Sequence, residues 1–552
     1  MNNSLKFYGI LLISLFLIGS SAFIGLAQQD KSGGKIIEAL ASEPTKLDIQ
    51  EATRRPEGAV LNLICEPLFI VGPDLEIQPL LASSWEVSDD YLTWTIHIKK
   101  GIKFHDGNPV NAEAVKFSLD RVRNGNNGWM LDPVESIEVV DDYTVALHLS
   151  ETYPVLPNYL ANYWMGIVSP AKVKEYGENY GAQYISGTGP YMFKEWVSGS
   201  RIVLERNENY KHGPSFASNQ GPAYADQWIF RFIPETSTLV AELQQGNVDL
   251  SYYIGAEAVD QLERHSNTEV AKKIAASNVH VGINLGYKKE GGEPLNKPFD
   301  DVKVREAVAH AINKEAVIKA AMMGVGKPTY TLTPPNVKMY WEEAWELGKK
   351  LTEYDPDKSR QLLEEAGWVD QDGDGVREKD GEELKAIFFA FTIPRYKRIA
   401  EVCQPMLQSV GFKVELKILE AGTLYERLER GEHDLIATAY FGWTIPQDGL
   451  VPMLKSKYIG TNTNHFHYNN PELEKLLDIS LRSTDEEERI EAINKAQEMV
   501  IKDVICAPIA NPYDVLGYKK DVGGVEQYAK HPWSFNSSQA MALRALELYK
   551  ES

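Results

Sequence analysis

Cysteine is scarce in this chain of 552 residues, which has only Cys65, Cys403 and Cys506. At most one disulfide could form, so a disulfide-dense scaffold is excluded, and no two cysteines have the short spacing of a metal site. Cys65 and Cys506 both follow aliphatic residues, which is typical of small buried side chains. We therefore expect these two thiols in the core.

Positive charge is also in short supply. The chain has 57 Lys and Arg against 78 Asp and Glu, which gives a net charge of -21. Such a balance argues against nucleic acid or an anionic membrane surface as the main partner. Hydrophobic residues make up 43% of the chain, so it can bury several cores, and its length suggests about three domains at roughly 150 residues each.

Long apolar runs are absent except at the start. Lys6 precedes an uncharged run from Phe7 to Ala27, which ends in a small residue, any residue and alanine. Residues 1–29 therefore read as a secretory signal peptide cleaved after Ala27. Because the run is close to the ~20 residues that span a bilayer, an uncleaved membrane anchor is the alternative. Either way, we expect an extracytoplasmic protein that is secreted, periplasmic or held at the cell surface.

Motifs of catalysis are missing as well. The chain has no Gly-x-Ser-x-Gly elbow, no His-Glu-x-x-His pair and no Gly-x-x-x-x-Gly-Lys loop. Gly187-Thr-Gly189 is followed by proline and strand-like residues, whereas a phosphate cradle needs a helix N-terminus. A secreted hydrolase with a carboxylate pair stays open, but nothing singles out a pair. We predict no enzyme, no catalytic residue and no cofactor.

Two segments contain side chains of the types that ligate metal ions. Asp370, Asp372 and Asp374 imitate the first half of a calcium loop, but its twelfth position is Gly381, and Glu382 falls one residue late. An acidic turn is favoured there.

The other segment is His465-Phe-His467, which places two imidazoles on one face of a predicted strand. No third ligand is in view, so solvent-facing histidines are favoured and no metal site is predicted.

The segment from Leu92 to Ser118 is the most regular of the chain. Apolar and polar residues alternate from Leu92 to Ile98, the pattern of a half-buried strand. After a turn, a second short alternating run follows at residues 102–104. Asn111 then offers an N-cap to a helix. The apolar face of this helix is formed by Val115, Leu119 and Val122.

Elsewhere, strands and helices alternate along the chain, which indicates an α/β protein. The predicted elements include helices over residues 60–70 and 424–428, strands over residues 35–40, 143–149, 279–285 and 412–419, and a helix opened by a capping box of Thr484 and Glu487.

Two groups of segments have a specific order of residues: Leu81 to Tyr91, Thr93 to Ile96 and Gly101 to Pro109 form the first, and Gly187 to Phe193 with Ile202 to Tyr210 form the second. Together they resemble the two signatures of the family 5 solute-binding proteins, the peptide, dipeptide and nickel receptors of ABC importers. Ile49 departs from the family pattern, which has proline after Leu-Asp, and no lipid-modified cysteine follows the leader.

The resemblance implies a two-lobed, periplasmic-binding-protein-like α/β fold of class II with an extra domain and a hinge between the lobes. Lobe 1 would consist of residues 30–72, 186–283 and 515–552, with residues 73–185 as its additional domain, and lobe 2 of residues 284–514. Such a monomer would capture a di- or oligopeptide in the interlobe cleft and deliver it to a membrane permease and its ATPase. An oligosaccharide or a nickel chelate is the alternative ligand.

The candidate binding loop runs from Tyr440 to Gly449. Tyr440 and Phe441 end a predicted strand, and aromatic side chains there either wall a cleft or cap a core. In the peptide receptors this loop carries a Trp and, three residues later, an Asp that pairs with the ligand's amino group. Trp443 matches the Trp, but the third residue onward is Pro446 and Asp448 comes two residues later. Either Asp448 serves, or the amine is recognised otherwise.

Two more ligand-binding candidates follow from the resemblance. Glu66 occupies the position of a family glutamate near the cleft, and Asn284 matches a family position at the lobe boundary. From spacing alone, Glu66 is simply a polar residue at the end of a helix.

Overall fold

The computed structural model describes residues 31–52, 54–182, 184–288, 298–461, 463–535 and 537–551. The predicted signal peptide or anchor at residues 1–29 lies outside this part of the chain. Within the described ranges, no helix is both long enough and apolar enough to cross a membrane.

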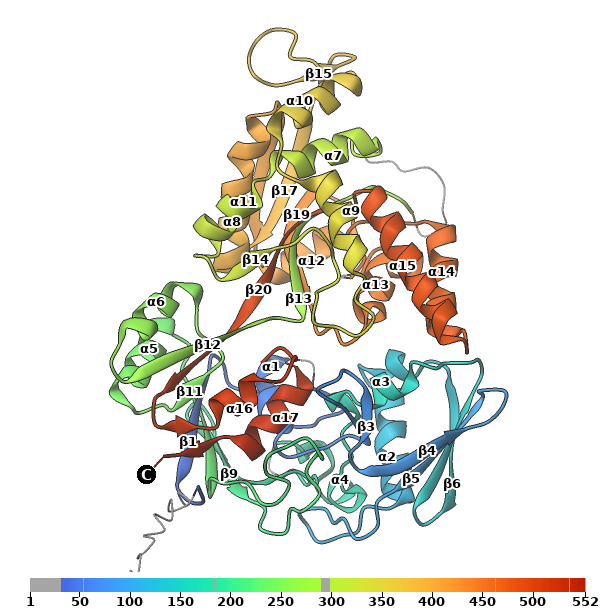
Figure 1. Cartoon of the computed structure of the whole chain (residues 1–552), viewed down its shortest axis with the longest axis vertical. Helices are drawn as coiled ribbons and strands as arrows, with labels where there is room; N and C mark the ends of the chain where they lie inside the picture. The colour runs from blue at the N-terminus through green and yellow to red at the C-terminus, as the bar shows by residue number, and fades with distance from the viewer. Residues whose placement is uncertain are drawn as a thin grey trace, which may run out of the picture.

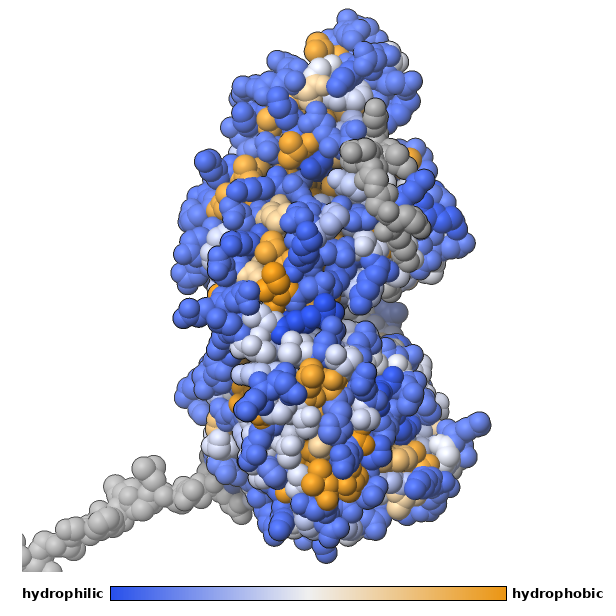
Figure 2. Space-filling model, turned by 90° about the vertical axis from the view of Figure 1, so that its right-hand side faces the viewer, coloured by the Kyte–Doolittle hydropathy of each residue, from blue (hydrophilic) through white to orange (hydrophobic). Residues whose placement is uncertain are grey.

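The molecule has two α/β lobes, one above the other, as expected (Figure 1). The lower lobe holds the first half of the described chain and also its C-terminal end. The upper lobe holds the segment in between. Figure 2, turned by 90°, shows the molecule narrowing between the lobes. Two separated stretches of chain thus join the lobes, which is the arrangement that a hinge requires.

The central sheet of the lower lobe is built around a parallel pair. β1 (Lys35–Leu40) pairs with β10 (Gln227–Phe232), and antiparallel strands continue the sheet outward. Ile36 of β1 and Trp228 and Phe230 of β10 are buried in the core of this lobe. The other strands of this sheet are β8 (Tyr191–Val197), β9 (Arg201–Arg206), β11 (Leu250–Ser251) and β12 (Thr268–Ile274). Two small two-stranded sheets, β2 (Phe69–Val71) with β3 (Ile77–Pro79) and β21 (Val522–Gly523) with β22 (Tyr549–Lys550), belong to the same lobe. Its helices include α1 (Arg55–Leu61), α5 (Thr236–Gln245), α6 (Ala256–Arg264), α16 (Val525–Ala529) and α17 (Ser538–Glu547).

A four-stranded antiparallel sheet forms the rest of the lower lobe, in the order β4-β5-β7-β6. The predicted alternation is confirmed: Trp94, Ile96 and Ile98 of β5 are buried, and the residues between them are partly exposed. Asn111 caps α2 as expected, since its side chain accepts from the Ala114 amide at 3.0 Å. The elements are β4 (Ala82–Val87), β5 (Thr93–Ile98), β6 (Val134–Asp141), β7 (Thr144–Leu149), α2 (Ala112–Arg123), α3 (Leu156–Leu160), α4 (Pro170–Tyr176) and the 3-10 turns η1 (Gly128–Leu131), η2 (Tyr163–Met165) and η3 (Gly177–Asn179).

The sheet of the upper lobe has the order β18-β17-β19-β13-β20, and helices lie on both sides of it (Figure 1). The elements are β13 (Ser277–Ile283), β14 (Gly326–Pro328), β15 (Glu378–Lys379), β16 (Glu382–Glu383), β17 (Lys385–Phe391), β18 (Lys413–Leu419), β19 (Leu435–Phe441), β20 (Cys506–Lys519), α7 (Val302–Ala311), α8 (Lys314–Ala321), α9 (Glu342–Thr352), α10 (Pro356–Glu365), α11 (Pro394–Gln408), α12 (Ala421–Glu429), α13 (Pro446–Leu454), α14 (Pro471–Arg482), α15 (Glu486–Lys502) and the turn η4 (Ser456–Tyr458).

The chain crosses between the lobes at two neighbouring points. β12 ends at Ile274 in the lower lobe, and β13 begins at Ser277 in the upper sheet. β20 pairs with β13 and β14 up to Pro512, and with β12 from Tyr513 onward. The amide of Ala275 donates to the Pro512 carbonyl at 2.8 Å, so the crossings are hydrogen-bonded together. We propose these two points as the hinge, which moves the first lobe boundary from residue 283 to about residue 275.

Several local predictions were wrong in their bounds. The helix predicted over residues 60–70 is α1, which ends at Leu61. Residues 102–104 form no strand beyond a bridge at Lys103. The N-cap of α15 is Asp485, whose carboxylate accepts from two amides of the first turn, so Thr484 is not the cap. The N-caps of α7 and α10 are Asp301 and Asp355, whose side chains each accept from an amide of the first turn.

One cluster of buried apolar side chains extends across both lobes. The same cluster contains Tyr153 and Leu156 from the lower lobe and Trp443 and Ile445 from the upper lobe. All three cysteines are buried and unpaired, which confirms the expectation for Cys65 and Cys506. The lobes therefore contact each other, and the residues at their boundary are candidates for the ligand site.

Candidate ligand-binding site

The predicted loop from Tyr440 to Gly449 is only partly a loop. β19 continues to Phe441, and α13 begins at Pro446, a residue whose fixed φ favours the first helical position. Only four residues, 442–445, connect the two elements. Gly442 has a φ of 85°, a left-handed conformation that glycine adopts without strain. The sharp turn therefore places Asp448 in the first turn of a helix.

The Asp448 carboxylate forms hydrogen bonds with the residues that connect β19 to α13. Its Oδ2 accepts from the amide and the hydroxyl of Thr444, at 2.7 and 2.5 Å, and from the amide of Ile445 at 3.1 Å. Capping of this kind satisfies the free amides of a helix N-terminus and suits a negative charge there. Oδ1 takes part in no hydrogen bond among the described residues. One carboxylate oxygen is thus fixed and the other is available.

Burial raises the pKa of Asp448 above its ordinary value, and the three hydrogen bonds oppose that effect. The carboxylate is thus partly desolvated but held in its charged form by donors. An incoming cation would replace the lost water and lower that pKa again.

Trp443 is buried between β19 and α13, with 2% of its surface exposed. Its indole lies flat against Gly449, where an added Cβ would come within 2.1 Å of the ring. The indole Nε1 donates to the Tyr440 carbonyl at 3.4 Å, and the two rings meet edge to face at 5.8 Å. Trp443 therefore fixes the loop from inside.

Tyr440 and Phe441 take different directions at the end of β19. The Tyr440 hydroxyl donates to the Asp448 carbonyl at 3.4 Å, so this ring belongs to the Asp448 surroundings. Phe441 is 49% exposed and lies under the Arg395 guanidinium, 5.8 Å from its ring centre. The structure thus brings Tyr440, Trp443 and Asp448 together and leaves Phe441 at their exposed edge.

Asn284 and Glu66 lie apart from this group. The Asn284 amide donates to the carbonyls of Gly431 and His433, at 3.2 and 2.7 Å, and accepts from the Gly286 amide. These bonds tie the end of β13 to the turn before β19.

Glu66 is buried in the lower lobe, not at a helix end. Its carboxylate accepts from Tyr210 at 2.7 Å and from Thr188 at 2.8 Å, and it lies 2.8 Å from His212 Nε2. Burial alone would raise the pKa of Glu66, but His212 and these hydrogen bonds bring it below its ordinary value. Both carboxylate oxygens of Glu66 therefore have hydrogen-bond partners that favour its charged form.

The structure adds residues that the sequence did not single out. The rings of Tyr153 and Tyr159 in the lower lobe stack at 5.6 Å. Burial raises the pKa of both phenols, and the charge of Asp448 in the upper lobe adds to this effect. Across the same boundary, Tyr458 adds to the rise in the pKa of Tyr153, and Tyr440 adds to the rise in the pKa of Tyr159. In Figure 1, α3, which carries Tyr159, lies at the top of the lower lobe beneath α13. Only the fold reveals this group, because its members lie far apart in the sequence.

The prediction of solvent-facing histidines at residues 465 and 467 was wrong. Both are buried, and the rings of His280 and His465 stack with 3.2 Å between their Nε2 atoms. The segment is no strand, so alternation did not apply to it. At the Asp-rich loop, Asp370, Asp372 and Asp374 converge with Glu378, but no cation is assigned to these exposed groups.

Comparison with known proteins identifies the class. The family of bacterial extracellular solute-binding proteins, family 5, matches residues 76–462, so the chain belongs to it and is a solute-binding protein. The glutathione-binding protein GsiB of Salmonella typhimurium is 27% identical over 515 residues, which cover 91% of this chain and 93% of GsiB.

Solved structures agree with this assignment. The periplasmic binding protein DppA of Helicobacter pylori, in complex with the peptide STSA, is 26% identical with a TM-score of 0.74, and the match covers 95% of this chain and 99% of DppA. NikA of Brucella suis, in complex with Fe(III)-EDTA, has a TM-score of 0.80 at 23% identity, over 94% of this chain and 100% of NikA, and shows the fold alone.

Proposed function

We propose that this protein captures di- or oligopeptides between its lobes as the binding component of an ABC importer and delivers them to the permease. The observation that carries the proposal is Asp448, which is fixed through Oδ2 and has Oδ1 available beside a group of tyrosines from both lobes. A protonated amino group fits this arrangement. Asp448 would then do what Pro446, at the family position of the aspartate, cannot do.

Electrostatics support a cationic group at this point. A partly desolvated carboxylate gains most from a charge-assisted hydrogen bond, which contributes about 1.5–3 kcal/mol. Tyr153, Tyr159 and Tyr440 all lie within electrostatic range of the Asp448 carboxylate. Aromatic faces attract cations at short range. A free amino terminus of a peptide supplies such a cation.

Closure of the lobes would complete the site. Asp448 and Tyr440 belong to the upper lobe, and Tyr153 and Tyr159 to the lower, so the four groups meet only when the lobes approach. Exposed ion pairs also join the lobes, Arg482 to Glu151 at 2.8 Å and Lys338 to Glu76 at 2.7 Å, although each contributes little energy. A bound ligand that contacts both lobes would shift the population toward the closed form.

The hinge connects directly to the binding loop. The amides of Gly442 and Trp443 donate to the Ala276 carbonyl, at 3.2 and 3.4 Å, immediately after the first crossing point. The loop would therefore turn with the hinge. Beyond the amine, an extended peptide would add its backbone to strand edges, which gives affinity without side-chain specificity.

The test is a titration with a panel of di- to pentapeptides, followed by intrinsic tryptophan fluorescence and by calorimetry. Saturable binding supports the proposal, whereas no response across the panel would overturn it. Binding of oligosaccharides with no peptide response would favour a sugar receptor of the same fold. Mass spectrometry of whatever co-purifies with the full chain would name the ligand directly.

A further inference from the structure

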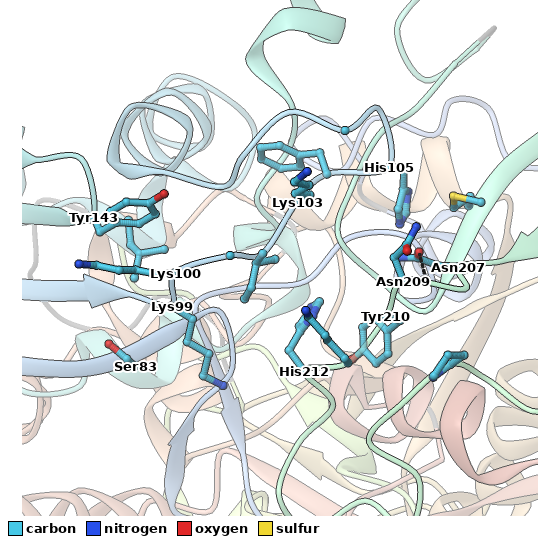
Figure 3. Close-up of a pocket in the computed structure, with 18 of the residues that line it drawn as sticks. Ser83, Lys99, Lys100, Lys103, His105, Tyr143, Asn207, Asn209, Tyr210 and His212 are labelled. Carbon is cyan, nitrogen blue, oxygen red and sulfur yellow. Dashed lines mark hydrogen bonds between the residues drawn. The ribbon is translucent and has the colours of Figure 1, made fainter.

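A separate cavity of about 1290 Å³ lies entirely within the lower lobe. One wall is the chain from His97 to Gly107, which follows β5, and the other is the loop from Asn207 to His212, which follows β9 (Figure 3). None of the residues that line it belongs to the upper lobe or to the tyrosine group around Asp448. The proposed peptide site therefore does not account for this cavity.

Lysines dominate the charge of the cavity. Lys99, Lys100, Lys103 and Lys211 all line it, and none of the four forms an ion pair among the described residues. In a chain with a net charge of -21, carboxylates are abundant, yet none in the described part of the chain lies within ion-pair distance of these ammonium groups. Four unpaired lysines on facing walls therefore create a local positive field.

The carboxylates that line the cavity are fewer and are already engaged. Glu208 pairs with Arg206 at 2.8 Å, and Asp141 accepts the Tyr143 amide at 2.8 Å. Lys100 also attracts the Asp141 carboxylate, although the two form no ion pair. Lysines thus outnumber carboxylates in the lining, four against two. Glu66, behind the lining, is bound by His212. The net charge of the cavity lining is therefore positive.

The polar lining is also held in place. His212 is fixed through Nε2 by Glu66, and His105 Nε2 lies 3.0 Å from the Gly189 carbonyl. Figure 3 shows the Lys99 side chain extending from one wall toward the side of His212. Burial lowers the pKa of Lys99, although Glu66 opposes this, so a bound anion would compensate for lost solvation.

We propose that this cavity binds a phosphate group carried on a larger molecule. Lysine ammonium groups bind phosphate as point charges, and no arginine lines the walls to favour a planar carboxylate instead. A cavity of this volume is far larger than inorganic phosphate, so it would also hold the group to which the phosphate is attached. That group could be a soluble ester or the headgroup of an anionic lipid.

The test uses the full chain and calorimetry with glycerol 3-phosphate, and then flotation with vesicles of phosphatidylglycerol or of phosphatidylcholine. The variant is Lys99→Ala/Lys103→Ala, and the matched control is Lys319→Ala/Lys350→Ala. The control removes two exposed upper-lobe lysines that likewise form no ion pair among the described residues. All three proteins contain the same N-terminal apolar run, so differences between them report on the lysines.

We expect binding of glycerol 3-phosphate, or of phosphatidylglycerol but not phosphatidylcholine vesicles, that weakens about ten-fold or more in the cavity variant and not in the control. Binding of the soluble ester identifies a solute site, and binding of vesicles alone identifies a headgroup site. No binding of either probe, or equal binding by all three proteins, overturns the proposal. Unchanged thermal unfolding and peptide titration in the variant separate this result from misfolding and from failure of the proposed function.

Discussion

Gly449→Ala is the sharpest perturbation of the binding loop, because two effects of opposite sign compete. Alanine in place of glycine inside a helix normally stabilises by about 1 kcal/mol. At Gly449 of α13, however, the new Cβ would lie 2.1 Å from the Trp443 indole, where ordinary contact begins at 3.4 Å. The buried indole would have to move. Overpacking of this kind costs about 1–3 kcal/mol, and we place this case at the upper end.

We therefore expect Gly449→Ala to lower the free energy of unfolding by about 2 kcal/mol, once the gain in helix propensity is subtracted. Urea denaturation measures the difference. Gly422→Ala is the matched control, because Gly422 lies in α12 and its added Cβ meets nothing within 4 Å. That variant should be stabilised by up to about 1 kcal/mol.

The same clash makes a prediction about coupling. In a Trp443→Leu background the obstacle is gone, so Gly449→Ala should no longer destabilise. If Gly449→Ala stabilises the wild-type protein as Gly422→Ala does, the indole does not lie on Gly449. The account of how Trp443 holds Asp448 would then be refuted.

Three further predictions follow from titratable and capping groups. Burial lowers the pKa of His280 and of His433 to about 3, against about 6.5 in the unfolded chain. Between these two pH values the unfolded chain binds more protons than the folded protein, so the free energy of unfolding should fall as the pH drops below about 6.5. Urea denaturation at several pH values measures this change. Because burial raises the pKa of Asp448, affinity for peptides should decline on acidification at a higher pH than for an ordinary aspartate, and calorimetry at several pH values tests this. Asp485→Ala should cost about 1 kcal/mol in urea denaturation, whereas Thr484→Ala should have little effect, and the reverse order would contradict the observed cap.

Local chemistry explains what the sequence predicted well. Strand alternation in β5 and the side-chain cap at Asn111 depend on neighbours within a few residues, and the structure has them as expected. The helix α13 was missed although Pro446 at its first position is a start signal, because Pro452 inside it argues against a helix. Neighbouring residues alone cannot decide between two such opposing signals.

Tertiary contacts explain what the sequence could not give. Tyr153 and Tyr159 come near Asp448 only because two lobes meet, and no periodicity connects such distant positions. The burial of His465 likewise depends on a distant partner, His280 of β13. The two walls of the lower cavity, which carry Lys99 and Lys211, also come from separate segments of the chain. The cavity could therefore not be predicted from the sequence. Family signatures mark the scaffold, whereas the sites arise where distant segments meet.

The most direct test of the central claim is a cycle of calorimetric titrations that pairs the wild type and Asp448→Asn with a free and an N-acetylated peptide of the same sequence. Asp357→Asn is the control, since Asp357 also lies in the first turn of a helix that begins with proline. Acetylation should weaken binding to the wild type and to the control by about ten-fold or more, and should have no further effect in Asp448→Asn. An equal loss on acetylation in all three proteins would show that Asp448 does not receive the amine.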